Sequence, residues 1–288
     1  IVRELPEADV HLVDEDGQWL RMTCERSNFR FPCLPAADFP SVPDAGGDSP
    51  QLVSSDVLGD MIRKTMFAIS QDETRYTYNG VFMESEGDML RLVATDGHRL
   101  ALIERPNDGA EFSTGVIIHK KALGELVKLL SETGKSVEIF LQENHVIFKS
   151  DSFELSARLI DGDFPKYRQV IPKDNEHRII TDRDKLLRAL RRVSLLSNET
   201  RIVKFIFGAG QLKLTTNGSE AGEAEEILES DYSGDELIIG FNARYCLDVL
   251  NILDEQNVCF QLKDSLSPGI LRPDEAEGYT YVIMPMRV

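Results

Sequence analysis

The sequence predicts an α+β protein built from a repeated unit of roughly 120 residues, in which two helices pack on antiparallel strands. Three observations support this prediction. Similar strings recur at a nearly constant spacing, four segments have the apolar spacing of amphipathic helices, and short strands fill most of the chain between them. The composition, with 42% hydrophobic and 28% charged residues, is ordinary for a folded globular chain.

The recurring strings divide the chain into three parts. Asp38-Phe39-Pro40 returns as Asp163-Phe164-Pro165, and the helical stretch 57–70 resembles 185–197. We therefore expect the last part of a first copy at 1–48, a second copy at 49–172 and a third at 173–288. The stretch 43–50, rich in Gly, Asp and Pro, is the expected linker between the first two, and 172–176 is the second linker.

Helices are expected at 57–69, 119–130, 183–196 and 242–253. In the third of these, Leu186, Leu190 and Val193 recur at helical spacing, and Asp182 precedes it as an N-cap. The first is expected to be capped by Ser54, Ser55 or Asp56. Strands are expected at 89–94, 99–103, 116–119, 137–141, 145–149, 153–160 and 281–286. In the first copy, strands 19–23 and 28–34 are expected to lack pairing partners, which leaves their edges exposed.

Several classes of protein are disfavoured. No apolar run approaches the roughly 20 residues that cross a bilayer, and no signal peptide is recognisable. The four cysteines are too widely spaced for a disulfide scaffold or a zinc site. We therefore expect a reduced, cytoplasmic protein without cofactor or metal. Because the chain of 288 residues begins at Ile1, we also expect its natural N-terminus to be missing.

Positive charge gathers on the predicted helices, although the net charge of −17 argues against a broad basic surface. Lys185, Arg188 and Arg192 share one face of the third helix. Lys121 and Lys128 share a face of the second, with Lys120 beside them, and Arg63 and Lys64 stand on the first. Two interpretations remain open: solvated helix faces, or one surface that faces phosphates without reading bases.

Four longer strings resemble one known family, the bacterial sliding clamp, which is the β subunit of DNA polymerase III. They are Leu-Pro-Ala-Ala-Asp-Phe-Pro at 34–40, Ala-Thr-Asp-Gly-His-Arg-Leu-Ala at 94–101, Asp-Gly-Asp-Phe-Pro-Lys-Tyr-Arg at 161–168, and Tyr-Val-Ile-Met-Pro-Met-Arg-Val at 281–288. The resemblance implies three similar domains per protomer and a head-to-tail dimer closed around double-stranded DNA, with helices inside. Compared with the family, this chain lacks most of the first domain, which supplies one interface of the ring.

The resemblance also implies a groove between the second and third domains that takes a short peptide. The implied partners are the replicative polymerase catalytic subunit, the clamp loader and other proteins with a clamp-binding motif. Gln169 and Tyr78 depart from the family pattern, so the peptide preference is expected to differ. The matching groove positions are Thr95, Gly97, His98, Arg99, Leu100, Pro165, Val170, Asn242, Tyr245, Leu266, Pro268, Val282, Ile283, Met284, Pro285, Met286 and Arg287.

DNA contact and ring closure are implied at further positions. For DNA these are Gln71, Arg75, Tyr76, Lys120, Lys121, Lys128, Lys185, Arg188 and Arg192. For the interface, Leu195 and Leu196 would meet Phe29 and Phe31 of a neighbouring protomer, while Glu225 and Glu226 would pair with Arg26.

Two other functions remain as alternatives to a non-catalytic clamp. The first is an enzyme in which His98, after Asp96-Gly97, acts as a base with a carboxylate orienter. No nucleophile motif, metal-ligand cluster or phosphate loop accompanies this histidine in the sequence. The second is a repeat-built adaptor that binds only peptides, which would need no basic bias on its helices.

Overall fold

The computed structural model describes residues 1–39, 43, 45, 50–107, 114–133, 136–197, 200–218, 222–275 and 277–288. The chain forms two compact units, Ile1–Asp44 and Ala45–Val288. The predicted linker at 43–50 lies largely outside the described residues, as does Pro40 of the first recurring string. In the described ranges, no helix is long and apolar enough to cross a membrane.

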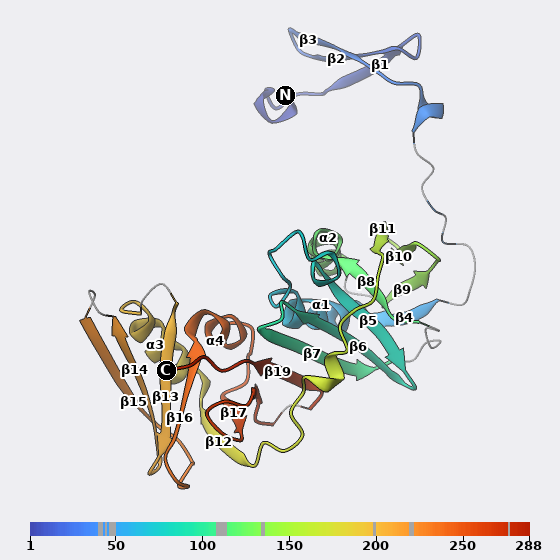
Figure 1. The fold of residues 1–288 in the computed structure, drawn as a ribbon. Helices are drawn as coiled ribbons and strands as arrows, with labels where there is room; N and C mark the ends of the chain where they lie inside the picture. Colours follow the sequence, from blue (N-terminus) through green and yellow to red (C-terminus); the bar gives the residue numbers. More distant parts are fainter. Residues whose placement is uncertain are drawn as a thin grey trace. The chain divides into compact units, whose positions relative to one another are not determined.

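The first unit is a three-stranded antiparallel sheet in the order β1–β2–β3 (Figure 1). Its elements are η1 (Val2–Glu4), β1 (His11–Glu15), β2 (Trp19–Cys24), β3 (Ser27–Pro32) and η2 (Ala36–Asp38). The expectation that its two predicted strands lack partners is wrong. The β2 strand pairs with β1 on one side and β3 on the other, because tight turns fold the chain back after each strand.

In the second unit, every α-helix among the described residues starts at the residue after a strand. The pairs are β4 (Gln51–Ser54) with α1 (Ser55–Met66), β8 (Val116–His119) with α2 (Lys120–Thr133), β12 (His177–Asp182) with α3 (Arg183–Ser194), and β16 (Leu237–Asn242) with α4 (Ala243–Leu250). Asp182 caps α3 as predicted, since its side chain accepts from the Lys185 backbone at 2.8 Å. Asn242 caps α4 in the same way at 3.0 Å. Ser54 stands at the N-cap of α1 without a side-chain bond.

Two sheets complete this unit and confirm the predicted α+β class. One has twelve strands in the order β12-β17-β18-β19-β7-β6-β5-β8-β11-β10-β9-β4, and the other has four in the order β15-β14-β13-β16. Helix α1 packs on α2 and helix α3 on α4. The remaining elements are η3 (Tyr76–Tyr78), β5 (Gly80–Glu86), β6 (Met89–Thr95), β7 (Arg99–Pro106), β9 (Ser136–Leu141), β10 (His145–Lys149), β11 (Glu154–Ile160), η4 (Tyr167–Gln169), β13 (Ile202–Gly208), β14 (Gln211–Gly218), β15 (Gly222–Glu229), β17 (Asn257–Leu262), β18 (Gly269–Pro273) and β19 (Tyr279–Ile283).

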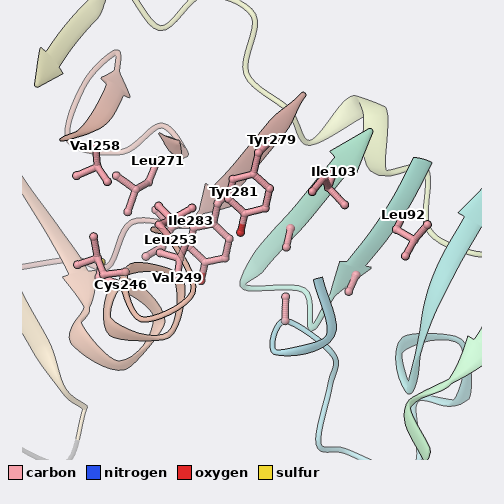
Figure 2. Close-up of a cluster of buried hydrophobic side chains, with 14 of the residues drawn as sticks. Leu92, Ile103, Cys246, Val249, Leu253, Val258, Leu271, Tyr279, Tyr281 and Ile283 are labelled. Carbon is pink, nitrogen blue, oxygen red and sulfur yellow. The ribbon is translucent and has the colours of Figure 1, made fainter. Parts of the chain in front are cut away.

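The larger sheet runs without a break from strands of the expected second copy (49–172) into strands of the expected third (173–288), hereafter called the second and third repeats, through the antiparallel pair β7–β19. Alternate residues of β19 face opposite sides of this sheet. Tyr279, Tyr281 and Ile283 point into the main core, and Figure 2 shows Tyr281 and Ile283 beside Val249 of α4. Val282 faces the other side, in a smaller apolar cluster with Val93, Leu100, Leu102, Tyr167 and Ile270. The junction therefore has an apolar layer on each face.

The expectation that Lys64 stands on the outward face of the first helix is wrong. Lys64 is buried, and its ammonium group is compensated by Asp60 one turn earlier at 3.2 Å. Its backbone carbonyl accepts the buried hydroxyl of Tyr279 from β19 at 3.1 Å. This face of α1 is turned toward the third repeat, whereas Arg63 is exposed as predicted.

Candidate functional site

A cavity of about 170 Å³ lies where the ends of β6, β7 and β19 meet the connector, which we define as residues 161–176 between β11 and β12. Its lining combines apolar walls with a few polar groups, a usual composition for a peptide or ligand site. Tyr78 contributes to the wall, as does Tyr167, which was not among the predicted groove residues. The predicted groove residues that line the cavity are Thr95, Gly97, His98, Arg99, Leu100, Pro165, Val170, Val282 and Met284.

The turn between β6 and β7 is held by its own polar side chains. One carboxylate oxygen of Asp96 accepts from the backbone of His98 at 2.9 Å and of Arg99 at 3.1 Å. The Thr95 hydroxyl donates to the Arg99 carbonyl at 2.6 Å and accepts from the Gly97 backbone at 3.1 Å. Gly97 has a φ of 92°, which a side chain would disfavour. The local sequence therefore fixes this rim of the cavity.

Arg99 joins the two repeats at the base of the cavity. Its side chain is 7% exposed, and its Nε donates to Asp96 at 3.0 Å. Its two terminal nitrogens donate to Asp248 of α4 at 2.5 Å and to the Phe67 carbonyl at 2.8 Å. The guanidinium carbon also lies 4.5 Å from the ring centre of Tyr245. A charge buried to this degree is tolerated because acceptors surround it.

Tyr167 forms part of the wall on the connector side. Its ring packs near Phe82 and Phe164, with centroid distances of 6.3 and 6.4 Å, and it belongs to the smaller apolar cluster behind the cavity. Burial and a hydrogen bond to Glu84 raise the pKa of its phenol. Tyr167 stands two residues after Pro165, the last residue of the recurring Asp-Phe-Pro string. This position is the only sequence feature that points to its place in the cavity wall.

The other predicted groove residues lie outside the cavity lining. Asn242 and Tyr245 begin α4, and the Tyr245 ring stacks on His98 with centroids 6.5 Å apart. The Met286 backbone donates to Gly240 of β16 at 2.8 Å, which places the segment Pro285, Met286 and Arg287 along that strand. Leu266 and Pro268 lie in the β17–β18 loop, and Leu266 is exposed. Ile283 is buried in the main core. His98 thus connects the cavity to a second surface on the third repeat.

The geometry around His98 does not form the acid–base pair of the enzyme hypothesis. The carboxylate of Asp96 accepts from the backbone N–H of His98 rather than from its ring. The ring itself is exposed and stacks on Tyr245. These contacts position a surface side chain, and they orient neither ring nitrogen.

The residues predicted to contact DNA differ in how available their charges are. Tyr76, Gln71, Lys121 and Arg188 are exposed. Arg75 instead donates to the Asp96 carbonyl at 2.8 Å and lies 3.9 Å from the ring centre of Tyr78, so its guanidinium packs beside the cavity. The remaining cations are half-buried or have carboxylate neighbours: Lys120 at the start of α2, Lys128 at 2.8 Å from Glu125, Lys185 at 4.0 Å from Glu229, and Arg192 at 2.6 Å from Glu226.

The residues predicted for the ring interface lie in both units. Phe29 and Phe31 share one face of β3, with ring centroids 6.4 Å apart, and Arg26 is exposed in the preceding turn. After α3, Leu195 is 80% exposed, an unusual position for a large apolar side chain, and Leu196 is half-buried. Glu226 pairs with Arg192, and Glu225 with Lys213 at 2.6 Å. A neighbour's arginine would therefore join existing ion pairs.

Comparisons with known proteins agree with this architecture. The central domain of the DNA polymerase III beta subunit matches residues 52–166, and the C-terminal domain of the same subunit matches residues 168–287. The beta sliding clamp of Caulobacter vibrioides is 40% identical over 296 residues, which cover 100% of this chain and 80% of the relative.

Solved structures give the same result. The Caulobacter crescentus beta sliding clamp has a TM-score of 0.93 at 40% identity, covering 100% of this chain and 78% of that one. A sliding clamp from Bartonella birtlesii bound to griselimycin has a TM-score of 0.92 at 39% identity, covering 100% and 79%. Because both family domains and relatives of this identity match along the chain, it belongs to the family of the DNA polymerase III beta subunit, the bacterial beta sliding clamps.

Proposed function

We propose that this DNA sliding clamp, a non-catalytic processivity factor, holds its partner proteins by a short peptide at the cavity and at the surface beyond His98. The observation that supports this proposal is the cavity itself, at the junction of two repeats. Its apolar walls suit aliphatic and aromatic side chains, and Met284 adds an adaptable thioether wall that tolerates different partners. The exposed side chain of His98 supplies a polar group that can orient a peptide backbone.

Membership of the family supports a wider assembly, which is part of the proposal. The chain would consist of the three domains 1–48, 49–172 and 173–288, and two full-length protomers would close head to tail around double-stranded DNA. Exposed cations such as Lys121 and Arg188 would attract phosphates without fixing a register, which permits sliding. The polymerase catalytic subunit, the clamp loader and other clamp-binding-motif proteins would share the groove. We place the protein in the bacterial cytoplasm, associated with the nucleoid during replication.

The mechanism is topological rather than chemical. A closed ring leaves DNA only over an end or by opening, so weak phosphate contacts are sufficient to keep it there. A polymerase tethered by its peptide rebinds the primer end in an intramolecular step, at an effective concentration set by the tether. The clamp's own residues supply attraction, enclosure and a docking groove.

Peptide binding tests the proposed groove. A fluorescent peptide with a Gln followed by an aliphatic–aromatic pair should bind saturably, and the same peptide with its apolar anchors changed to Ala should bind far more weakly. Met284→Ala should weaken binding, whereas Ile227→Ala, an exposed apolar residue on β15, should leave it unchanged. A folded protein that fails to bind the first peptide would refute the proposal.

A further inference from the structure

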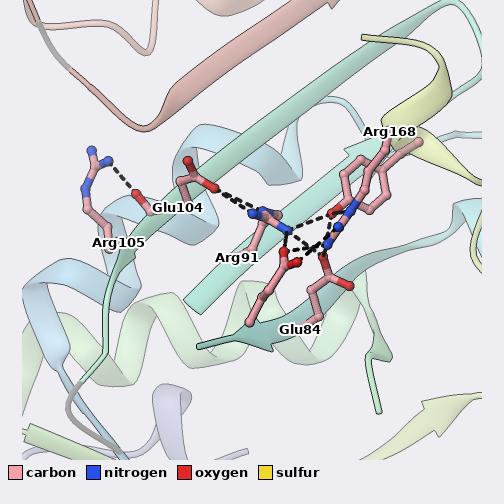
Figure 3. A network of polar contacts seen from close by, with 7 residues as sticks. Glu84, Arg91, Glu104, Arg105 and Arg168 are labelled. Carbon is pink, nitrogen blue, oxygen red and sulfur yellow. Dashed lines mark hydrogen bonds and ion pairs between the residues drawn. The ribbon is translucent and has the colours of Figure 1, made fainter. Parts of the chain in front are cut away.

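A row of charged side chains crosses the sheet behind the connector (Figure 3). Glu84 of β5, Arg91 of β6 and Glu104 of β7 are direct cross-strand neighbours. Arg91 donates to Glu84 at 2.9 Å, to Glu86 at 2.8 Å, and to Glu104 at 3.1 and 2.9 Å. Arg168 of the connector donates to the same Glu84 and Glu86 at 2.9 and 2.7 Å. The network therefore joins three strands to the connector.

Two carboxylates of this network, those of Glu84 and Glu86, stay ionised. Burial alone would raise the pKa of Glu84, but hydrogen bonds from Tyr167, Arg168 and Arg91 hold it below its ordinary value. Hydrogen bonds from Arg168 and Arg91 lower the pKa of Glu86 to about 2. Both arginines remain charged as well. These two carboxylates and two guanidinium groups thus keep their charges at any pH near neutrality.

Tyr167 links this network to the cavity. Its hydroxyl donates to Glu84 and accepts from Arg91 at 3.2 Å and from Arg168 at 3.1 Å. A tyrosine hydroxyl has one proton and two lone pairs, so all of its hydrogen-bonding capacity is used. The ring of the same residue lines the cavity. One side chain therefore has its polar end fixed by three charged groups and its apolar face in the wall of the groove.

The connector is anchored at its other end to the third repeat. The side-chain nitrogen of Asn175 donates to the carbonyls of Gln261 at 2.8 Å and Pro268 at 3.0 Å. Beside it, Asp174 pairs with Lys263 at 2.5 Å. The residues between the two anchors include Val170, which lines the cavity. Both ends of this wall are therefore held, one on each repeat.

We propose that Glu84 and the hydroxyl of Tyr167 are positioning residues for peptide binding: they hold the connector so that Tyr167 and Val170 form the wall that receives an apolar anchor side chain. This inference rests on the proposed function. Isolated surface ion pairs contribute little. Here, however, Glu84 is only 19% exposed and accepts from three donors, so the loss of one donor leaves a poorly solvated carboxylate and a less constrained wall.

The test compares three variants by fluorescence titration with the peptide described above and with its anchor-to-Ala version. Tyr167→Phe removes the hydroxyl and keeps the ring, and Glu84→Gln removes the charge and keeps the shape. Lys149→Gln is the matched control, because it breaks an exposed ion pair, Lys149–Glu154 at 3.4 Å, on other strands of the same repeat. All titrations are made below the thermal unfolding midpoint of each variant.

The first two variants should raise the Kd of the intact peptide by roughly tenfold, the equivalent of one charged hydrogen bond, and Lys149→Gln should stay within about twofold. With the anchor-to-Ala peptide, Tyr167→Phe and Glu84→Gln should not raise the Kd above the wild-type value for that peptide, since the wall then has no anchor side chain to receive. Unchanged Kd values, or equal losses with both peptides, would overturn the inference and leave the groove intact as a proposal. A wild-type protein that binds neither peptide would overturn both.

Discussion

The buried arginine between the repeats offers a quantitative test of how the two are joined. The substitution Arg99→Met keeps an unbranched apolar side chain but removes the guanidinium. Asp96 and Asp248 then lose their cation, and the Phe67 carbonyl loses its donor. Because Asp248 belongs to α4 and Arg99 to β7, the substitution removes an interaction between repeats rather than within one.

The expected loss in the free energy of unfolding depends on how deeply the two aspartates that pair with Arg99 are buried. Removing one member of a buried ion pair costs about 3–5 kcal/mol, because the partner charge remains poorly solvated. Asp96 is 14% exposed and Asp248 is 29% exposed, so water compensates Asp248 in part. We therefore expect the lower end, about 3 kcal/mol. With a urea dependence of about 1–3 kcal/mol per molar, the unfolding midpoint should fall by about 1–3 M.

Two comparisons make this prediction specific. Lys128→Met breaks an exposed ion pair with Glu125 at 2.8 Å and should change stability by less than about 1 kcal/mol. Adding Asp248→Asn to Arg99→Met should recover part of the loss, since it removes the stranded charge. Equal urea midpoints for Arg99→Met and Lys128→Met would refute the reasoning.

Three further measurements follow from the contacts described above. Glu86→Gln should be less stable than wild type above pH 4.5, and the difference should disappear as the pH falls to about 2. The lowered pKa of Glu86 stabilises the folded state fully above pH 4.5, and this stabilisation is lost as the pH falls toward the folded-state pKa of about 2. Chemical unfolding at several pH values measures the difference in stability between the variant and wild type. Arg188→Gln should reduce the slope of log binding against log salt for duplex DNA by about 0.9, and Arg192→Gln by less, because Glu226 already neutralises Arg192. Gly97→Ala should lower stability by about 1–2 kcal/mol in thermal unfolding, since the φ of 92° disfavours a side chain.

Local features of the fold were predictable from the sequence. Leu186, Leu190 and Val193 recur at helical spacing, and Asp182 can cap only the helix that follows it, so α3 is recognisable from neighbouring residues alone. The first turn of the cavity rim is equally local, because Thr95 and Asp96 bond to the backbone within four residues. Such features depend on spacing along the chain, which a sequence displays directly.

Features that depend on distant segments were not predictable. Nothing near Ile283 in the sequence says which side of β19 faces the main core, because that depends on pairing with β7. The helical spacing of Arg192 suggests a free cation, but Glu226 reaches it from β15. Tyr167 likewise becomes a groove residue only when strands β5 and β6 place Glu84 and Arg91 beneath it.

The pairing of β7 with β19 also has a consequence for biosynthesis. About 180 residues separate the two strands, and at 5–20 residues per second the ribosome needs roughly 9–36 s to make them. During that interval β7 has no partner on one side, and its apolar residues Leu100 and Leu102 lie on an open strand edge. The nascent second repeat is therefore exposed to wrong pairing with other chains until β19 arrives. Faster translation of the third repeat should shorten this period. Closely spaced ribosomes on one messenger RNA should make wrong pairing between nascent chains more frequent.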